Sequence, residues 1–274
     1  MTRREAVHVG GFPISYLIAG EGNRLVLLLH GTYWSRVWQP VLDGIAAVGL
    51  RPVAVDFPGF GRSGGELTLG EASVPRLSAW LLHFVEALGH RGPVRVAGHD
   101  IGGGVAQHFM LANGAKVPRV AVVNGVMYDS WPVPGVARFR DPFVAAATTR
   151  DDVLAARRVS VVKALGRPAT EAEIEEYLDP WTDPRVARSW LALAGAADNR
   201  YTQEMLPGLL QSRTPKLLVW GEDDSFQTVD YAERYASEIP ETKLVRIKSA
   251  GHIPMENDPN GVADALAQFF SAER

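Results

Sequence analysis

The position with the clearest chemical potential in this sequence is Asp100, within the segment AGHDIGG (residues 97–103). Residues 94–97 form an apolar run that predicts a short buried strand, and residues 101–113 have the pattern of a helix. Glycines two positions before and two positions after Asp100 permit the tight strand-to-helix turn that exposes a nucleophile. Serine usually occupies such a turn and attacks acyl carbons, so a carboxylate there predicts different chemistry.

Aspartate is ionised at neutral pH and needs no base to make it a nucleophile. Its attack on an acyl carbon gives only an anhydride, whereas it displaces well at a saturated carbon with a leaving group or a strained ring oxygen. The product is an ester between enzyme and substrate. A histidine can then activate water to attack the carbonyl of that ester. The oxyanion formed needs preorganised donors, each worth about 10²–10³ in rate.

Four segments at expected strand ends could supply these groups. They are LHGTYW (residues 29–34), DFPGFGRS (56–63), GHDIGG (98–103), and WGEDD (220–224) paired with AGH (250–252). In kind, order and spacing they resemble the α/β-hydrolase superfamily, and the resemblance covers almost the whole chain.

This resemblance implies a catalytic triad with Asp100 as nucleophile, His252 as base and Asp224 as the acid that orients the histidine. Asp223 is the second candidate for the acid, and Asp129 is a third.

The oxyanion donors implied by the resemblance are two backbone N–H groups. That of Ile101 lies at the start of the helix after Asp100, and that of Thr32 follows the His-Gly pair of the first segment. Epoxide hydrolases usually have His-Gly-x-Pro in this segment, whereas Tyr33 occupies the proline position here.

Superfamily members with an Asp nucleophile are epoxide hydrolases, haloalkane dehalogenases and haloacetate dehalogenases. The dehalogenases usually place Trp or Arg directly after the nucleophile, to hold the halide or a substrate carboxylate. Ile101 occupies that position and its side chain has no donor. Epoxide hydrolysis is therefore the preferred reaction.

Epoxide opening needs a proton donor, usually a tyrosine of the helical cap. Tyr201 and Tyr177 are the candidates within the predicted cap, with Tyr128 at its base. Tyr33 and Trp34 are expected to line an aromatic pocket or to donate to a leaving group.

Three alternative functions stay open from the sequence. A haloalkane or haloacid dehalogenase would hold halide with Trp34, Tyr33 or a tryptophan of the cap. An ester or lactone hydrolase would use Asp100 as a general base for water. A non-catalytic, ligand-binding relative would keep the pocket without turnover, although such a protein has no need for a complete triad.

The elements that must position these residues alternate along the chain. Apolar runs predict strands at residues 15–19, 25–29, 52–55, 94–97, 120–123, 216–220 and 243–247, and helical patterns occupy residues 75–88, 101–113, 229–239 and 262–270. This order predicts an α/β fold with a mostly parallel central sheet flanked by helices. Residues 129–213 contain no such apolar run. We expect residues 1–128 and 214–274 to form the core and residues 129–213 a helical cap, or lid.

Composition limits the remaining possibilities. The 274 residues carry a formal net charge of −3 and no cysteine, which excludes disulfides and thiolate chemistry and does not favour nucleic acid as a partner. Histidines such as His83, His90 and His108 lack ligand spacing, so we expect no metal and no other cofactor. No signal peptide or membrane span is apparent. We expect a cytoplasmic monomer or homodimer with a small, apolar substrate.

Overall fold

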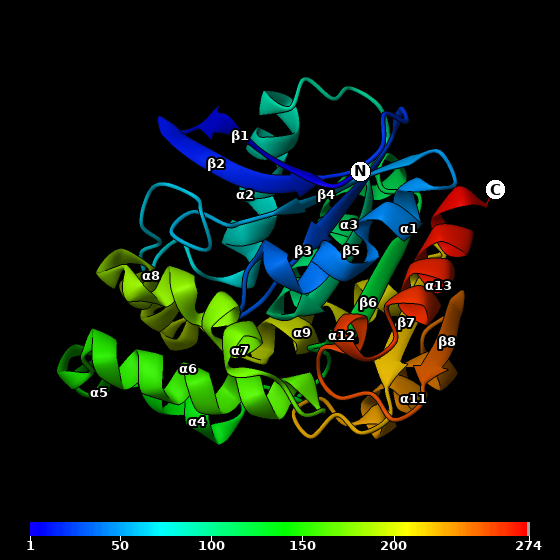
Figure 1. Cartoon of the computed structure of the whole chain (residues 1–274). Coiled ribbons are helices and arrows are strands. Elements are labelled where there is room, and N and C mark those ends of the chain that lie inside the picture. Colours follow the sequence, from blue (N-terminus) through cyan, green and yellow to red (C-terminus); the bar gives the residue numbers. More distant parts are fainter. Residues whose placement is uncertain (273–274) are drawn as a thin grey trace.

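Eight strands form one sheet in the order β1-β2-β4-β3-β5-β6-β7-β8 in the computed structural model, which describes residues 1–272 (Figure 1). β1 pairs antiparallel with β2, and β2 with β4, while all later neighbours are parallel. The strands are β1 (Arg3–Val9), β2 (Phe12–Ile18), β3 (Arg24–Leu29), β4 (Leu50–Val55), β5 (Arg95–Asp100), β6 (Val120–Gly125), β7 (Lys216–Gly221) and β8 (Thr242–Ile247).

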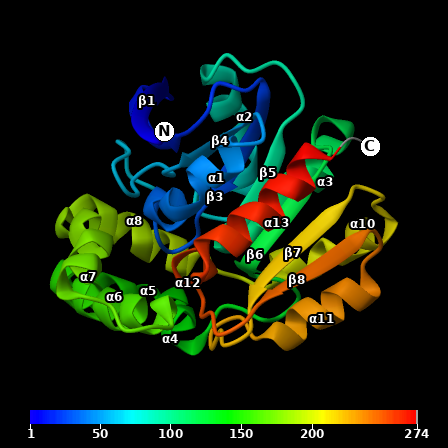
Figure 2. The same ribbon diagram turned by 45° about the vertical axis from the view of Figure 1, so that its right-hand side comes forward.

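The central strands are apolar on both faces because helices cover the sheet from both sides. In β3, Leu25, Leu27 and Leu29 point into one core while Val26 and Leu28 point into the other. The first core is closed by α2 (Val74–Ala87), α3 (Ile101–Asn113) and α11 (Val229–Glu238), and the second by η1 (Ser35–Val41), α1 (Leu42–Ala46) and α13 (Pro259–Ser271). Figure 2 shows α13 lying across its face of the sheet.

Between β6 and β7 the chain leaves the sheet and forms a helical segment, which we call the helical insertion. It comprises α4 (Pro134–Ala137), η3 (Arg138–Arg140), α5 (Pro142–Ala147), α6 (Arg150–Leu165), α7 (Glu171–Leu178), η4 (Asp179–Thr182), α8 (Pro184–Gly195), α9 (Arg200–Glu204) and α10 (Leu206–Gln211). Its green and yellow-green helices lie below the sheet in Figure 1. Capping boxes at Thr149 and Thr170 begin α6 and α7.

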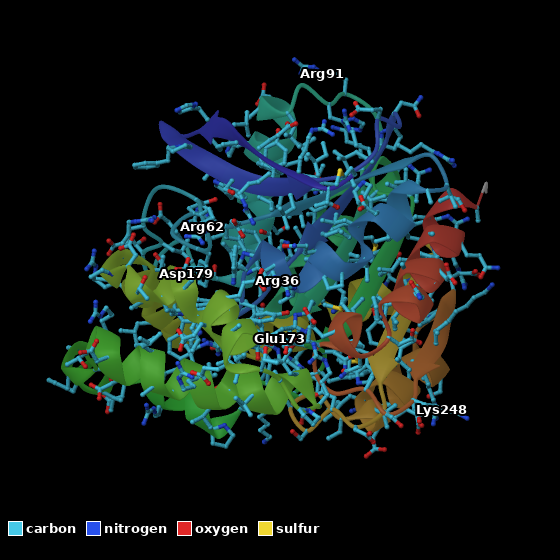
Figure 3. All side chains as sticks on the ribbon, viewed as in Figure 1. Arg36, Arg62, Arg91, Glu173, Asp179 and Lys248 are labelled. Carbon is cyan, nitrogen blue, oxygen red and sulfur yellow. The ribbon has the colours of Figure 1, made fainter. Side chains whose placement is uncertain are left out.

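Charged side chains join the helical insertion to the core. Glu256 of α12 (Pro254–Asn257) accepts hydrogen bonds from Arg36 of η1 at 2.7 Å, and from Arg167 and Tyr177 of the insertion at 3.1 and 2.8 Å. Arg62, in the loop after β4, pairs with Asp179 (Figure 3). Glu256 is largely buried, so it holds the insertion more firmly than exposed pairs such as Arg62–Asp179 do.

The predicted α/β fold with a mostly parallel sheet is confirmed, and all seven predicted strands are present. The prediction missed β1, whose polar sequence RREAVHV forms an exposed edge strand. It also missed four short helices of the core, namely η1, α1, η2 (Gly114–Lys116) and α12. The division of the chain at residues 129 and 213 stays a prediction. Within residues 1–272, no helix combines the length and apolar character that crossing a membrane requires.

Candidate active site

Asp100 ends β5 in a backbone conformation that L residues rarely adopt, with φ 56° and ψ −128°. The turn is possible because the surrounding backbone is closely packed. A Cβ at Gly98 would lie 1.9 Å from the carbonyl oxygen of Gly102, and a Cβ at Gly102 would lie 2.6 Å from that of Leu29. The glycines on both sides of Asp100 therefore let α3 begin directly against β3 and β5. The strained turn presents the carboxylate at the carboxyl end of the sheet.

One oxygen of the Asp100 carboxylate is held by the loop after β3. Its Oδ2 accepts hydrogen bonds from the backbone N–H of Thr32 at 2.9 Å and from the Thr32 hydroxyl at 2.8 Å. A Cβ at Gly31 would lie 2.4 Å from the backbone nitrogen of Ile101 and 2.6 Å from Oδ2. Glycine at position 31 thus lets this loop close over the carboxylate. Thr32 and Ile101, the predicted oxyanion donors, both border Asp100.

His252 and Asp224 form the hydrogen bond expected of a base and its orienting acid. Nδ1 of His252 lies 2.8 Å from Oδ2 of Asp224, and Asn124 donates to the same Oδ2 at 2.7 Å. The other oxygen, Oδ1, accepts the backbone N–H groups of Phe226 and Gln227 at 2.7 and 3.1 Å. Asp224 is thereby fixed, and it directs Nε2 of His252 away from itself.

Burial and neighbouring charges set the protonation states of His252, Asp224 and His99. Burial alone would lower the pKa of His252, but the Asp224 carboxylate outweighs it and raises the pKa above its usual value. Burial opposes ionisation of Asp224, yet the hydrogen bonds from His252 and Asn124 lower its pKa. Burial, and then the charge of His252, lower the pKa of His99 to about 4. His99 therefore stays neutral, and its Nε2 lies 2.8 Å from the carbonyl oxygen of His252.

Asp100 and His252 share a cavity of about 490 Å³, which also borders Thr32, Tyr33 and Ile101. The core forms its base, and the helical insertion forms its roof. The insertion contributes Trp131, Val136, Phe139, Arg157 and Trp190, among others. The site is therefore a largely apolar pocket with a carboxylate and an imidazole at its base.

Polar groups of the roof stand out because they lack partners. Nε and Nη2 of Arg157 and Nε1 of Trp190 are buried without a hydrogen bond in the described chain. Arg157 is only 3% exposed, and its Cζ lies 4.6 Å from the ring centroid of Tyr33. Buried polar groups are usually satisfied, so these donors are the unusual feature of the roof.

Several predicted site residues lie elsewhere. The OH of Tyr177 donates to Glu256, and the indole N–H of Trp34 donates to the carbonyl oxygen of Tyr177 at 3.2 Å. Tyr201 is half-buried and does not border the cavity within residues 1–272, and Tyr128 donates to Glu238. The structure therefore brings Tyr33, but not Trp34, Tyr177 or Tyr201, to the cavity.

The three candidates for the acid that orients His252 differ in their burial. Asp224 is buried against His252, whereas Asp223 and Asp129 are exposed. Sequence reasoning missed Asn124, although a polar residue at the end of the apolar run VAVV was a usable signal. It also missed Arg157, which nothing in the charged sequence RDDVLAARR distinguishes from Arg158.

Comparison with known proteins identifies the family and agrees with the fold. The profile of the α/β-hydrolase family matches residues 26–265. A 2-hydroxy-6-oxononadienedioate/2-hydroxy-6-oxononatrienedioate hydrolase of Burkholderia vietnamiensis is 26% identical, with 87% of this chain and 84% of the relative covered.

Two solved structures share the fold at low identity. The epoxide hydrolase CorEH superposes with a TM-score of 0.82 at 21% identity and covers 99% of both chains. The haloalkane dehalogenase DatA of Agrobacterium tumefaciens C58 has a TM-score of 0.81 at 19% identity, covering 98% of this chain and 96% of its own. Together with the family match over most of the sequence, the shared fold shows that this chain belongs to the α/β-hydrolase family and is a hydrolase.

Proposed function

We propose that the protein hydrolyses epoxides through a covalent ester on Asp100. The observation that carries the proposal is the pair of hydrogen bonds from Thr32 to Oδ2 of Asp100. In a serine hydrolase these donors await the carbonyl oxygen of the substrate. Here the nucleophile's own oxygen occupies them, which leaves Oδ1 to attack and Oδ2 to become the oxyanion later.

In the first step, Oδ1 attacks a saturated ring carbon of the epoxide and the C–O bond breaks. The ring oxygen takes the proton of Tyr33, and the substrate becomes an ester on Asp100. Burial raises the pKa of Tyr33 to about 12, against the opposing effect of Arg157, so the phenol is protonated at neutral pH. Solvent later returns a proton to Tyr33.

In the second step, His252 takes a proton from water, and the hydroxide adds to Cγ of Asp100. The negative charge that forms on Oδ2 is stabilised by the backbone N–H of Thr32, and we assign the second donor to Ile101. Collapse of this intermediate breaks the bond between Cγ and Oδ1, and Oδ1 takes the proton from His252 and leaves as part of the diol. The carboxylic acid left at Asp100, which now contains the oxygen of water, loses its proton to solvent. Asp224 holds the imidazolium in position through both transfers.

The same geometry disfavours the ester or lactone hydrolase. An acyl substrate would need the donors of Thr32 for its own carbonyl oxygen, and Asp100 already holds them. The triad residues also argue against a role in binding alone, since a binding protein gains nothing from a buried Asp224–His252 pair beside a second carboxylate.

Dehalogenation is a second candidate because of Trp190. Trp190 borders the cavity and its buried indole N–H has no partner in the described chain, so this group is a candidate donor for a departing halide. The first step then breaks a carbon–halogen bond and needs no proton, and the second step is the same.

We also propose that residues 129–213 act as a cap. Their contribution of Trp131, Arg157 and Trp190 to the roof of the cavity supports this role. By covering the ester, such a cap excludes bulk water and strengthens the electrostatic interactions inside.

Single-turnover hydrolysis in ¹⁸O-water tests the covalent step, because the solvent oxygen enters Asp100 before it reaches the product. Peptide mass analysis should find the label in Asp100. Product formed with unlabelled Asp100 would rule out the proposal. The variant His252→Gln should accumulate the ester, seen as an added substrate mass, and His83→Gln is its control.

A panel of matched epoxides and halides then separates the two candidates. Diol formation from the epoxides supports the first, and halide release without turnover of the epoxides supports the second. The variant Tyr33→Phe sharpens the result, since it removes the proposed proton donor and should slow epoxide opening more than halide displacement.

A further inference from the structure

We propose that the substrate is a short carboxylic acid whose carboxylate is bound by Arg157, with the reacting carbon next to the carboxyl group. The inference rests on the proposed function for the reaction at Asp100 and adds the class of substrate. It replaces the apolar substrate that the sequence suggested. Its starting observation is an arginine buried in the roof of the cavity without an anion.

Arg157 lies on α6 and is 3% exposed, yet no ion pair joins it to a carboxylate of the described chain. Its Nε and Nη2 have no hydrogen-bond partner. A buried guanidinium always carries its charge, and burial of an unpaired charge is strongly unfavourable. Nε and one Nη form the fork that matches the two oxygens of a carboxylate, so the free atoms are suited to bidentate binding.

Aromatic rings hold Arg157 in place. Its Cζ lies 4.6, 5.2 and 5.5 Å from the ring centroids of Tyr33, Trp181 and Trp190. These rings attract the cation through their faces and leave Nε and Nη2 without a hydrogen-bond partner. The guanidinium is therefore preorganised for an anion rather than satisfied by its surroundings.

The charges around the cavity have the matching sign. Arg138, Arg157 and Lys163 border it, and Asp100 is the acidic residue among its lining side chains. Asp224 lies behind His252 and does not line the space. Arg138 and Lys163 are exposed, while Arg157 is deep, so positive charge extends from the surface to the interior. Such an arrangement attracts anions and directs them inward.

The distance between Arg157 and the reacting groups limits the length of the substrate. Tyr33 is close to both: its ring centroid is 4.6 Å from Cζ of Arg157 and 6.1 Å from the ring centroid of His252, so Arg157 and His252 are at most about 11 Å apart. A carboxylate on Arg157 therefore leaves room for only a short carbon chain before the reacting carbon meets the groups at the base of the cavity. An epoxide or halide carbon bonded directly to the carboxyl carbon fits this spacing.

Two matched pairs of compounds test the inference. They are oxirane-2-carboxylate with oxirane-2-carboxamide, and 2-chloropropionate with 2-chloropropionamide, which differ in charge and little in shape. The wild-type enzyme should prefer the carboxylate by about 10² in kcat/KM, because the amide cannot form the two charge-assisted hydrogen bonds. Equal or better turnover of the amides would overturn the inference without any variant.

The variant Arg157→Met then tests whether Arg157 causes the preference for carboxylates over amides. In this variant the ratio of kcat/KM for carboxylate over amide should fall to about 1, and Arg157→Lys should restore part of it. The control is Arg158→Met on the same helix, whose guanidinium faces Glu171 and Glu175 outside the cavity and whose loss should leave the ratio unchanged. A ratio that persists in a folded Arg157→Met protein contradicts the assignment.

Binding separates failure of this inference from failure of the proposed function. Calorimetry with propanoate and propanamide requires no reaction. If neither oxirane nor chloride is turned over but wild type binds propanoate, and Arg157→Met does not, the carboxylate site stands and the proposed chemistry fails. If turnover labels Asp100 with ¹⁸O but propanoate and propanamide bind equally, the chemistry stands and the carboxylate site fails.

Discussion

The carboxylates at the base of the cavity and the N–H donors of its roof differ in how completely hydrogen bonds satisfy them. At the base, the carboxylates of Asp100 and Asp224 accept hydrogen bonds from Thr32, Asn124 and His252. In the roof, the indole N–H of Trp190 and two nitrogen atoms of Arg157 have no partner. Carboxylates held in this way keep their geometry in the absence of substrate, whereas the unpartnered donors of the roof gain their interactions only when a ligand arrives.

In the proposed function, this difference separates two tasks. Groups that act on the reacting carbon are held by strand ends and by backbone N–H groups, which move little. Groups that select the substrate are carried by side chains of the helical insertion. Substitutions at the base should therefore abolish turnover of every substrate, and substitutions in the roof should alter the choice among substrates.

The largest effect is expected at the base from Asp224→Asn. An amide would leave His252 without a charged acceptor and can favour the wrong tautomer, so hydrolysis of the ester should slow by about 10³–10⁴. Rapid-quench measurements should show that alkylation of Asp100 is affected less. The matched control is Asp223→Asn, because Asp223 is adjacent in sequence and exposed. Equal losses in both variants would contradict the assignment of the acid.

Gly31→Ala should come next, because its Cβ would meet Ile101 N and Oδ2 of Asp100 at 2.4 and 2.6 Å. Displacement of the loop would weaken an oxyanion donor, with an expected loss of about 10²–10³ in the rate of ester hydrolysis. Gly70→Ala is the control, since a Cβ there meets nothing within 4 Å. A Gly31→Ala enzyme with wild-type single-turnover rates would show that the base tolerates movement.

A smaller effect, about tenfold in kcat, is expected in the roof from Trp190→Phe, which removes one N–H donor to the leaving group while keeping most of the ring. The companion variant is Trp181→Phe. Its indole nitrogen is also buried and unpartnered, but Trp181 does not line the cavity within the described residues. Steady-state kinetics with a halide and an epoxide should separate the two variants. Equal losses of kcat in the two variants would mean that the packing of the indole ring, and not hydrogen-bond donation by its N–H group, is responsible.

The smallest change is a shift in pH dependence. Burial and Arg157 lower the pKa of His252, but the Asp224 carboxylate, which keeps its charge in the ester, raises it, and in the free enzyme the net result lies above the usual 6.5. Because protonated His252 cannot activate water, ester hydrolysis should decline as the pH falls through a pKa above 6.5. Stopped-flow rates of the second step should show this limb, displaced further toward alkaline pH in Arg157→Met. A rate of ester hydrolysis that declines only below pH 6.5 would contradict the raised pKa of His252.

The sequence also indicated which residues meet at the base. Asp100, His252 and Asp224 occur at the ends of apolar strands, and parallel strands bring their carboxyl ends to one edge of the sheet. Gly98 and Gly102 marked the turn. The residues of the base therefore depend on strand order, which the alternating pattern reveals.

The roof was predicted poorly because it depends on how helices pack. Tyr177 and Tyr201 were chosen as donors by residue type, but Tyr177 faces Glu256 and Tyr201 lies outside the cavity. Arg157 and Arg158 are adjacent and chemically identical, yet one is buried among aromatic rings and the other pairs with glutamates. Periodicity places residues on a helix but does not say which face meets the core.

Glu256 links the helical insertion to the loop that carries His252. It lies four residues after His252, and it binds Arg167 and Tyr177 of the insertion as well as Arg36 of the core. A chimaera that exchanges only the insertion with that of a relative would replace the side chains that Glu256 contacts. The loss of these contacts would displace the loop that carries His252. An exchange intended to alter substrate range should therefore include the segment from His252 to Asn257 together with the insertion.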